Sequence, residues 1–131
     1  MERNGSHVSN ASVLVIDDDP AVLETSADLL KEYGYNVIRS DNARDAIRRI
    51  REEKVDVILT DIKMPDISGI ELLEEIRSLE IEVPVILMTA YAELDVAVSA
   101  MGKGAFDFIV KPYKPELLIH AVDMAVKHSR W

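Results

Sequence analysis

The sequence predicts a doubly wound α/β fold built around a five-stranded parallel sheet. Three observations predict it: five short apolar segments alternate with five segments of helical periodicity, the connections between them are short, and most of the apolar segments lack polar alternation. Apolar runs without alternation indicate strands that are covered on both faces. Strict strand–helix alternation indicates right-handed crossovers, which place helices on both sides of the sheet.

The five expected strands are bounded by turn-forming residues. They span residues 13–16, 36–39, 55–60, 85–89 and 106–110. The second strand is shorter and more polar than the others, so we place it at an edge of the sheet. With this edge, the strand order 2-1-3-4-5 fits best. That order leaves a crevice at the carboxyl ends of strands 1 and 3, where ligands bind in sheets of this kind.

Helical spacing follows each strand. The first expected helix opens at Pro20, which suits a first turn, and closes at Gly34, which suits a C-terminal stop. The second is expected at about 43–52, with Asp41 or Asn42 as its cap. The other three are expected at about 70–79, 93–101 and from 115 onward, and the fourth is only weakly amphipathic.

Composition limits the classes of function. The 131 residues suit one domain, and 48% hydrophobic and 30% charged residues are ordinary for a globular chain. A net charge of −9 and a pI near 4.7 argue against binding to nucleic acid or anionic lipid. No apolar run approaches the ~20 residues of a membrane span. The absence of cysteine suits a reducing compartment, so we expect a cytoplasmic protein.

Domain organisation is expected to be simple. Residues 1–11 are polar and unpatterned, and Gly5-Ser6-His7 can be a remnant of cloning, so this segment is treated as a tail. Residues 12–127 form the expected folded domain. Residues 128–131 are expected to begin a linker or a C-terminal tail.

Polar side chains mark the ends of the four apolar strands. Asp17 and Asp18 follow strand 1, Asp61 follows strand 3, Thr89 closes strand 4 and Lys111 follows strand 5. Each alone has an ordinary structural interpretation, as a helix cap, a strand end or a solvated charge. Because the carboxyl ends of parallel strands share one edge, we expect the five side chains to meet.

Three carboxylates in one crevice need a positive partner. Each like-charge pair costs roughly 4 kcal/mol at a 4 Å separation and an effective dielectric of 20. An oxygen-only set suits Mg²⁺, and Lys111 supplies a second positive charge. A carboxylate nucleophile, a metal, an ammonium and a hydroxyl are what phosphoryl transfer needs. We therefore expect Asp61 to be a phosphoryl acceptor, with Thr89 and Lys111 stabilising the phosphoryl oxygens.

Four strings carry a family resemblance: Val-Leu-Val-Ile-Asp-Asp-Asp-Pro at 13–20, Asp-Ile-Lys-Met-Pro-Asp-Ile-Ser-Gly at 61–69, Met-Thr-Ala at 88–90 and Lys-Pro-Tyr at 111–113. Together they resemble response-regulator receiver domains, of which the chemotaxis regulator is the simplest. The resemblance covers residues 13–126. It implies a flavodoxin-like (βα)5 three-layer sandwich. It also implies a cis peptide bond before Pro112, an isomer that sequence alone cannot show, and at Gly69 a loop conformation that is barred to larger residues.

The resemblance also implies a place in a two-component phosphorelay. Asp61 would take the phosphoryl group from phosphohistidine on a sensor histidine kinase or phosphotransfer protein. Asp18, Asp61 and the backbone carbonyl of Lys63 would bind Mg²⁺ directly, and Asp17 mainly through a water. Such a domain catalyses only its own phosphorylation and dephosphorylation, so we expect a signalling domain and not an enzyme.

A conformational switch is part of the same implication. Thr89 would move toward the phosphate and Phe108 would rotate inward, reshaping the face of helix 4, strand 5 and helix 5 that serves dimerisation or contact with an output domain. Phe108 stands where the family often has Tyr, so a hydrogen bond from that ring is lost; the alternative is that Phe108 is always inward. Lys63 and Tyr91 flank the path of the hydrolytic water, and Tyr91 is expected to prolong the phosphoryl lifetime.

Three other interpretations remain open. A haloacid-dehalogenase-type phosphohydrolase also uses Asp, Mg²⁺, Thr and Lys, but that family would want Thr or Val at position 21, where this chain has Ala. A flavin-binding electron carrier would want a Ser/Thr/Gly-rich phosphate loop after strand 1. A receiver that is never phosphorylated, acting only as an interaction module, would not need the intact acidic set. The input signal, the cognate kinase and the output domain cannot be read from the residues.

Overall fold

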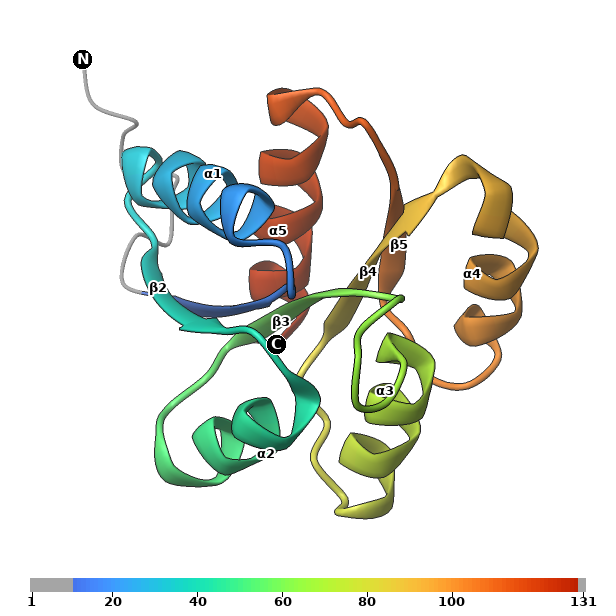
Figure 1. Cartoon of the computed structure of the whole chain (residues 1–131). Helices are drawn as coiled ribbons and strands as arrows, with labels where there is room; N and C mark the ends of the chain where they lie inside the picture. The colour runs from blue at the N-terminus through green and yellow to red at the C-terminus, as the bar shows by residue number, and fades with distance from the viewer. Residues whose placement is uncertain (1–10, 130–131) are drawn as a thin grey trace.

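Five strands and five α-helices alternate along the chain in the computed structural model, which describes residues 11–129 (Figure 1). The strands are β1 (Ser12–Ile16), β2 (Asn36–Ser40), β3 (Val57–Asp61), β4 (Val85–Ala90) and β5 (Asp107–Lys111). The helices are α1 (Pro20–Glu32), α2 (Ala43–Glu52), α3 (Gly69–Ser78), α4 (Leu94–Met101) and α5 (Pro115–Ser129). The strands form one parallel sheet in the order β2-β1-β3-β4-β5, as predicted, with the polar second strand at an edge.

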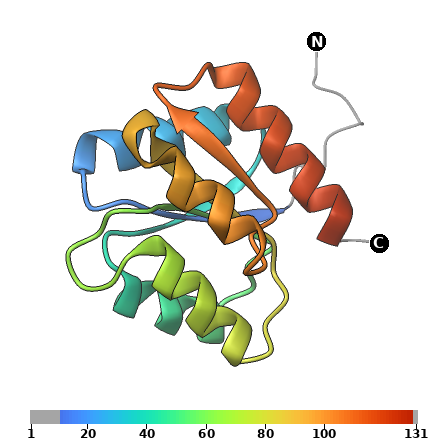
Figure 2. The ribbon, with the colours of Figure 1, turned by 90° about the vertical axis from the view of Figure 1, so that its right-hand side faces the viewer.

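Helices cover both faces of the sheet, which gives three layers (Figures 1 and 2). Alternate residues of the inner strands supply the two cores. Val15, Leu59 and Met88 pack on the side of α1 and α5, whereas Ile16 and Ile58 pack on the side of α2, α3 and α4. Burial on both sides explains why the inner strands read as continuous apolar runs.

Several boundaries differ from those expected. The third strand begins at Val57 and not at Val55, and it includes Asp61. The fourth helix begins at Leu94, one residue later than expected, and a short 3-10 turn, η2 (Tyr91–Glu93), precedes it. Ala11 is buried and its carbonyl accepts the amide of Asn36, so the ordered core starts one residue earlier than expected. Residues 1–10 of the predicted tail, which include His7, and residues 130–131 lie outside the described residues.

Local signals explain where the helices start and stop. Asp19 caps α1 by accepting a hydrogen bond from the Ala21 amide, and Asn42 caps α2 through the amide of Asp45. Gly34 follows α1 with a φ of +94°, a conformation that Gly adopts at low cost. Within residues 11–129, no helix combines the length and apolarity of a bilayer crossing.

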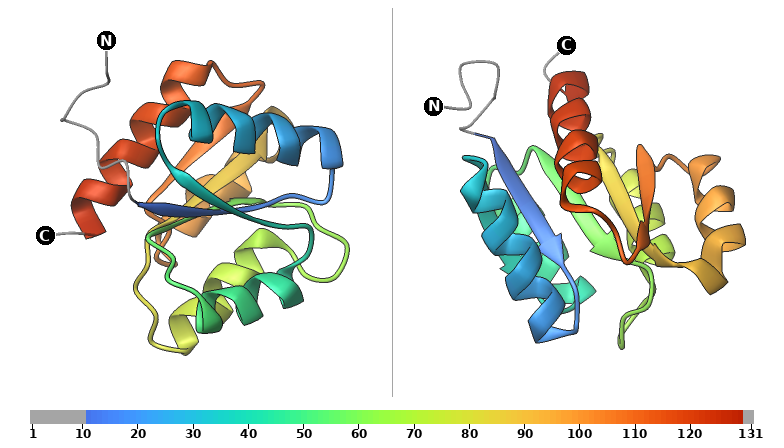
Figure 3. Two further views of the ribbon diagram at one scale, coloured as in Figure 1. Left: turned by 90° about the vertical axis from the view of Figure 1, so that its left-hand side faces the viewer. Right: turned by 90° about the horizontal axis from the view of Figure 1, so that it is seen from above.

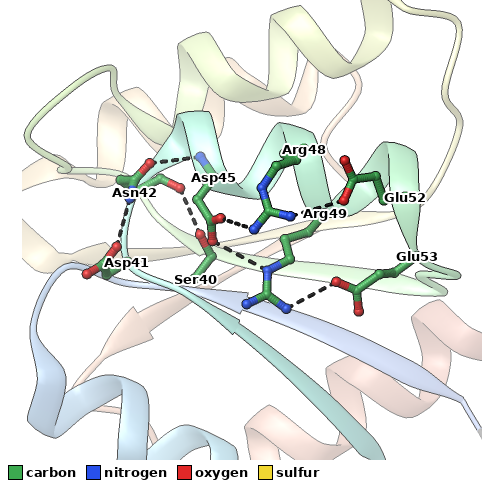
Figure 4. Close-up of polar contacts among 8 residues, drawn as sticks. All are labelled: Ser40, Asp41, Asn42, Asp45, Arg48, Arg49, Glu52 and Glu53. Atoms are coloured by element: carbon green, nitrogen blue, oxygen red, sulfur yellow. Dashed lines mark hydrogen bonds and ion pairs between the residues drawn. The ribbon is translucent and has the colours of Figure 1, made fainter.

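The α2 helix carries a run of ion pairs on its exposed side (Figure 4). Arg48 contacts Asp45 at 2.6 Å and Glu52 at 3.0 Å, and Arg49 contacts Glu53 at 3.1 Å. Partial burial acts to raise the pKa of Asp45, but the hydrogen bonds from Arg48 and Ser40 outweigh it and lower that pKa. Ion pairs at this helical spacing stabilise a helix modestly. This charged surface stabilises the helix next to the polar edge strand.

Candidate functional site

The functional side chains lie at the carboxyl edge of the sheet. In Figure 2 the loops that follow β1 and β3 lie side by side at the left edge, and Figure 3 shows the same edge from the opposite side. Asp17 and Asp18 begin the first loop, and Asp61 is the last residue of β3. Pairing of β1 with β3 sets Ile16 beside Thr60, so Asp17 and Asp61 leave neighbouring strands at the same level.

Three of the predicted residues form a carboxylate cluster. Asp17, Asp18 and Asp61 each offer an oxygen, and these oxygens all lie within 4.8 Å of one another. They range from the buried Asp17 to the exposed Asp18. Such a set has one open side toward solvent, which suits a hard cation that keeps part of its water shell.

Asp17 is the clearest sign that this cluster needs a cation. Its side chain is 0% exposed, its Oδ1 accepts the amide of Asp19 at 2.9 Å, and its Oδ2 is buried without a hydrogen-bond partner. Burial raises the pKa of the Asp17 carboxyl and the charge of Asp61 raises it further, while the Asp19 amide and Lys111 oppose this. An unsatisfied buried carboxylate oxygen is costly. The donor set therefore fits Mg²⁺.

Lys111 reaches into the cluster from β5. Its Nζ lies 3.2 Å from Asp61 Oδ1 and 3.9 Å from Asp17 Oδ2. Asp61 Oδ1 also accepts the amide of Ile62 at 2.9 Å. The Lys111–Pro112 peptide bond is cis, an isomer that the family resemblance implied and the sequence alone could not show. The Lys111 ammonium and the Ile62 amide both contact Oδ1 of the partly exposed Asp61, so neither of them occupies its Oδ2.

Thr89 lies on β4, which pairs with β3, and Phe108 lies on β5, the next strand along the sheet. Register places Met88 opposite Asp61, so Thr89 is the next residue along β4. Thr89 is buried and its hydroxyl donates to the carbonyl of Ala90 at 3.0 Å. Phe108 is partly buried and packs against the core beneath α2, α3 and α4. In this structure the Thr89 hydroxyl is thus hydrogen-bonded to the backbone.

Gly69 allows the β3–α3 loop to turn closely under Asp61. A Cβ at this position would lie 2.3 Å from the carbonyl oxygen of Asp61, and the Gly69 amide donates to Ile62 at 2.7 Å. The sequence-based expectation was a backbone conformation barred to larger residues. That reason was wrong: among the described glycines, positive φ occurs at Gly34 and Gly104. Gly69 is required by contact and not by φ.

The same loop carries two anchors that sequence reasoning missed. Ser68 and Glu71 form a capping box at the start of α3, and the Ser-x-x-Glu spacing could have revealed it. Asp66 accepts the amides of Ala43 and Arg44, at 3.3 and 3.1 Å, across to the start of α2. Partial burial acts to raise the pKa of Asp66, but hydrogen bonds from the backbone amides of Ile67, Arg44 and Ala43 hold it below its ordinary value. No local pattern announces a contact between residues this far apart.

Lys63 and Tyr91 occupy the rim of the site. The Lys63 ammonium lies 2.9 Å from the carboxylate of Glu93, a residue that the sequence did not single out. Glu93 raises the pKa of Lys63, and the charge of Asp61 adds to this effect. The Tyr91 side chain is 77% exposed. Lys63 and Glu93 thus connect the β3–α3 loop to the start of α4.

The arrangement favours a nucleophile at the end of β3 over one at the end of β1. A phosphohydrolase of the haloacid-dehalogenase type would attack from the first strand. Asp17, at that position, is fully buried and its Oδ1 is occupied by the Asp19 amide. Asp61 is partly exposed and lies against a cation. An incoming phosphorus atom can therefore reach Asp61.

Comparison with known proteins is consistent with this geometry. A sequence profile of the response regulator receiver domain matches residues 13–123. The transcriptional regulatory protein ZraR of Escherichia coli K12 is 36% identical over 120 residues, which are 92% of this chain and 27% of ZraR. The regulatory protein AtoC of the same strain is 38% identical over 115 residues, 88% of this chain and 25% of AtoC. The chain thus spans about a quarter of the length of these relatives.

Solved structures show the same architecture. A response regulator receiver domain protein from Clostridium thermocellum superposes with a TM-score of 0.87 at 34% identity, over 92% of this chain and 97% of that one. A receiver domain protein from Methanospirillum hungatei, described as CheY-like, superposes with a TM-score of 0.85 at 31% identity, again over 92% and 97%. The parallel sheet of order 2-1-3-4-5 is common to this architecture and to the present chain.

Proposed function

Because the chain belongs to the response regulator receiver domain family, we propose that Asp61 accepts a phosphoryl group in a two-component phosphorelay. The observation that carries the proposal is the contact between a partly exposed Asp61, the Lys111 ammonium and two further carboxylates. The donor is phosphohistidine on a sensor histidine kinase or a phosphotransfer protein. The domain acts only on its own phosphorylation state.

The transfer is a displacement at phosphorus. A carboxylate oxygen of Asp61 forms the new P–O bond while the P–N bond to the donor histidine breaks, and that electron pair returns to the imidazole nitrogen. Lys111 already lies against Asp61 Oδ1, so its charge is in place to stabilise the phosphoryl oxygens as they approach. The Thr89 hydroxyl leaves the Ala90 carbonyl and donates to a phosphoryl oxygen in the product.

Mg²⁺ would be held by Asp18, Asp61 and the backbone carbonyl of Lys63, with Asp17 acting mainly through a water. When bound, the ion supplies charge that offsets the carboxylates and the phosphoryl oxygens. The buried Oδ2 of Asp17 supports this assignment, because it accepts no hydrogen bond and the Lys111 ammonium lies 3.9 Å away from it. The fully buried Asp17 carboxylate adds negative charge to the site and makes no contact with solvent.

Output is proposed to run through the face of α4, β5 and α5. Loss of the Thr89–Ala90 contact gives Phe108 room to turn inward, and this changes the surface on which a second copy or an output domain docks. ZraR is a transcriptional regulatory protein, and both ZraR and AtoC are more than three times as long as this chain, which supports an output domain as partner. A DNA-contacting role is assigned to such a partner and not to this acidic domain, whose net charge is −9. We also propose a cytoplasmic location, because a chain without cysteine suits a reducing compartment.

The direct test is incubation with Mg²⁺ and acetyl phosphate, followed by intact-protein mass measurement. The wild-type chain is expected to gain one phosphoryl group, and Asp61→Asn none. Asp19→Asn is the matched control, because Asn keeps the cap on α1 and lies outside the carboxylate cluster. An adduct on Asp61→Asn, or none on the wild type, would refute the assignment.

A further inference from the structure

We propose that Glu93 is a positioning residue that holds the Lys63 ammonium at the mouth of the site and so ties the start of α4 to the β3–α3 loop. Phosphorylation of Asp61 then draws Lys63 away and frees α4. The inference rests on the proposed function, because the release needs a phosphoryl group on Asp61. It goes further by naming the contact through which the phosphorylated site reaches α4.

The pair joins two loops of the site. Lys63 lies two residues after Asp61, and Glu93 lies at the end of η2, directly before α4. Lys63 Nζ and Glu93 Oε2 are 2.9 Å apart. The Lys63 side chain is 80% exposed and that of Glu93 only 19%. The carboxylate is therefore fixed by the fold, and the ammonium on its long stem is the end that can leave.

The start of α4 depends on this contact more than an ordinary helix start would. Glu93 is the N-cap residue, yet no side chain caps the helix, since the Glu93 carboxylate is turned to Lys63. Of the eight residues of α4, only Ala97 and Ala100 are buried. Two alanine side chains bury little apolar area. The Lys63–Glu93 ion pair therefore adds a contact at a helix end that has no side-chain cap and little buried apolar surface.

Phosphorylation changes the competition for Lys63. Asp61 is close enough to contribute to the raised pKa of Lys63. A phosphoryl group replaces the single carboxylate charge with about −1.5 to −2 and adds acceptor oxygens. An exposed ammonium two residues away can reach those oxygens without breaking any buried contact. The Glu93 carboxylate then loses its partner, and the ion pair no longer connects the first turn of α4 to the β3–α3 loop.

Hydrogen exchange at the amides of residues 97–99 measures how stably the start of α4 is held, because these amides form the hydrogen bonds of its first turns. In the resting protein, Glu93→Gln is expected to exchange about two- to fivefold faster than wild type, the range for a partly exposed ion pair. Asp95→Asn is the matched control, since it removes a first-turn carboxylate that does not contact Lys63, and it is expected to exchange like wild type. Wild type treated with acetyl phosphate and Mg²⁺ is expected to reach the Glu93→Gln rate.

A charge swap separates pairing from loss of a side chain. Lys63→Glu combined with Glu93→Lys restores an ion pair across the two loops, so slow exchange is expected to return relative to Glu93→Lys alone. Equal exchange in Glu93→Gln and Asp95→Asn, or no rescue by the swap, would overturn the resting contact. Mass measurement on the same samples separates the two proposals. No adduct on wild type refutes the proposed function, whereas an adduct without faster exchange refutes the release alone.

Discussion

The Lys111 ammonium and the Asp61 carboxylate are 3.2 Å apart at the carboxyl edge of the sheet. The two residues come from β5 and β3, which are separated by β4, so each side chain must lean across that strand's end to meet. The same ammonium lies 3.9 Å from Asp17 Oδ2, which has no hydrogen-bond partner. The Lys111 ammonium is thus shared by a buried carboxylate and a partly exposed one.

Replacing Lys111 with Met is expected to slow adduct formation on Asp61 by roughly a hundredfold, the effect of removing one transition-state donor. Met keeps the length of the side chain but removes the charge that stabilises the phosphoryl oxygens. The measurement is the rate of adduct formation by mass with acetyl phosphate at saturating Mg²⁺. Lys114→Met, three residues along the chain, is the control and should react as wild type does. A wild-type rate in Lys111→Met would remove Lys111 from the mechanism.

Tyr91 is expected to prolong the phosphoryl lifetime by limiting the approach of water. Its ring lies at the rim and is 77% exposed, so it can be removed with little effect on folding. Tyr91→Ala should lose the phosphoryl group about three- to tenfold faster, which corresponds to about 1 kcal/mol of barrier. Tyr91→Phe keeps the ring and should retain the wild-type lifetime. The decay of the adduct is followed after removal of acetyl phosphate, and identical decay in all three proteins would exclude shielding.

Gly69→Ala is expected to destabilise the fold by about 1–3 kcal/mol, because its Cβ would meet the Asp61 carbonyl oxygen at 2.3 Å and the backbone of β3 must shift. The same shift displaces Asp61, so adduct formation should slow as well. Urea unfolding and adduct formation measure the two effects. Gly102→Ala is the matched control, since its Cβ would meet Ser99 at an ordinary 3.6 Å and its φ is −74°. A stable, fully active Gly69→Ala variant would show that the β3–α3 loop can shift to accommodate the added methyl group.

Arg77 is expected to matter for stability far more than an ordinary surface arginine. Its guanidinium donates to the carbonyls of Ile81, Val83 and Gly104, all at 2.8–2.9 Å, and so joins the loop after α3 to the loop after α4. Arg77→Met leaves these acceptors without their donor and should cost about 2 kcal/mol in urea unfolding. Arg77→Lys should rescue little, because one ammonium cannot reproduce the fork.

Arg51→Met is the control for Arg77, because Arg51 lies on the exposed side of α2. It should change the free energy of unfolding by less than about 0.5 kcal/mol. If the two variants unfold at the same urea concentration, the three carbonyls find water instead, and the loop connection is not energetically significant.

Patterns within a strand or a helix were sufficient for the fold and for most of the site. Apolar runs and turn residues located the five strands, and strand order followed from the polar second strand. Asp17, Asp18, Asp61 and Lys111 could be brought together from topology alone, since parallel strands end at one edge. The meeting of these residues could be predicted without knowing the conformations of the loops.

Contacts between loops could not be predicted in the same way. The Asp66 cap on α2 and the Lys63–Glu93 pair each join residues from different connections, and no local periodicity encodes such a meeting. Gly69 was correctly singled out but for the wrong reason, because close approach to the Asp61 backbone is a tertiary fact. The short 3-10 turn before α4 was also missed, because a weakly amphipathic pattern does not determine where a helix starts.

The Tyr35 hydroxyl donates to the Asp123 carboxylate of α5, and this contact predicts a stability change at high pH. The Tyr35 side chain is 3% exposed; burial raises its pKa, and Asp123 raises it further. An unfolded Tyr titrates near 10. A pKa that is higher in the folded state stabilises the protein below about pH 10, and this contribution is lost as the pH rises above that value.

Tyr35→Phe should therefore cost about 1 kcal/mol at pH 8, where the hydrogen bond is intact. Above about pH 10 only the wild type loses folding stability, because Tyr35 must either stay protonated or ionise in the core. The difference in free energy of unfolding between the two proteins should therefore narrow as the pH rises. Urea midpoints at pH 8 and pH ~11 measure the gap. Tyr91→Phe, on an exposed ring, should track wild type at both values. A gap that stays constant across this range would show that Tyr35 does not titrate differently on folding.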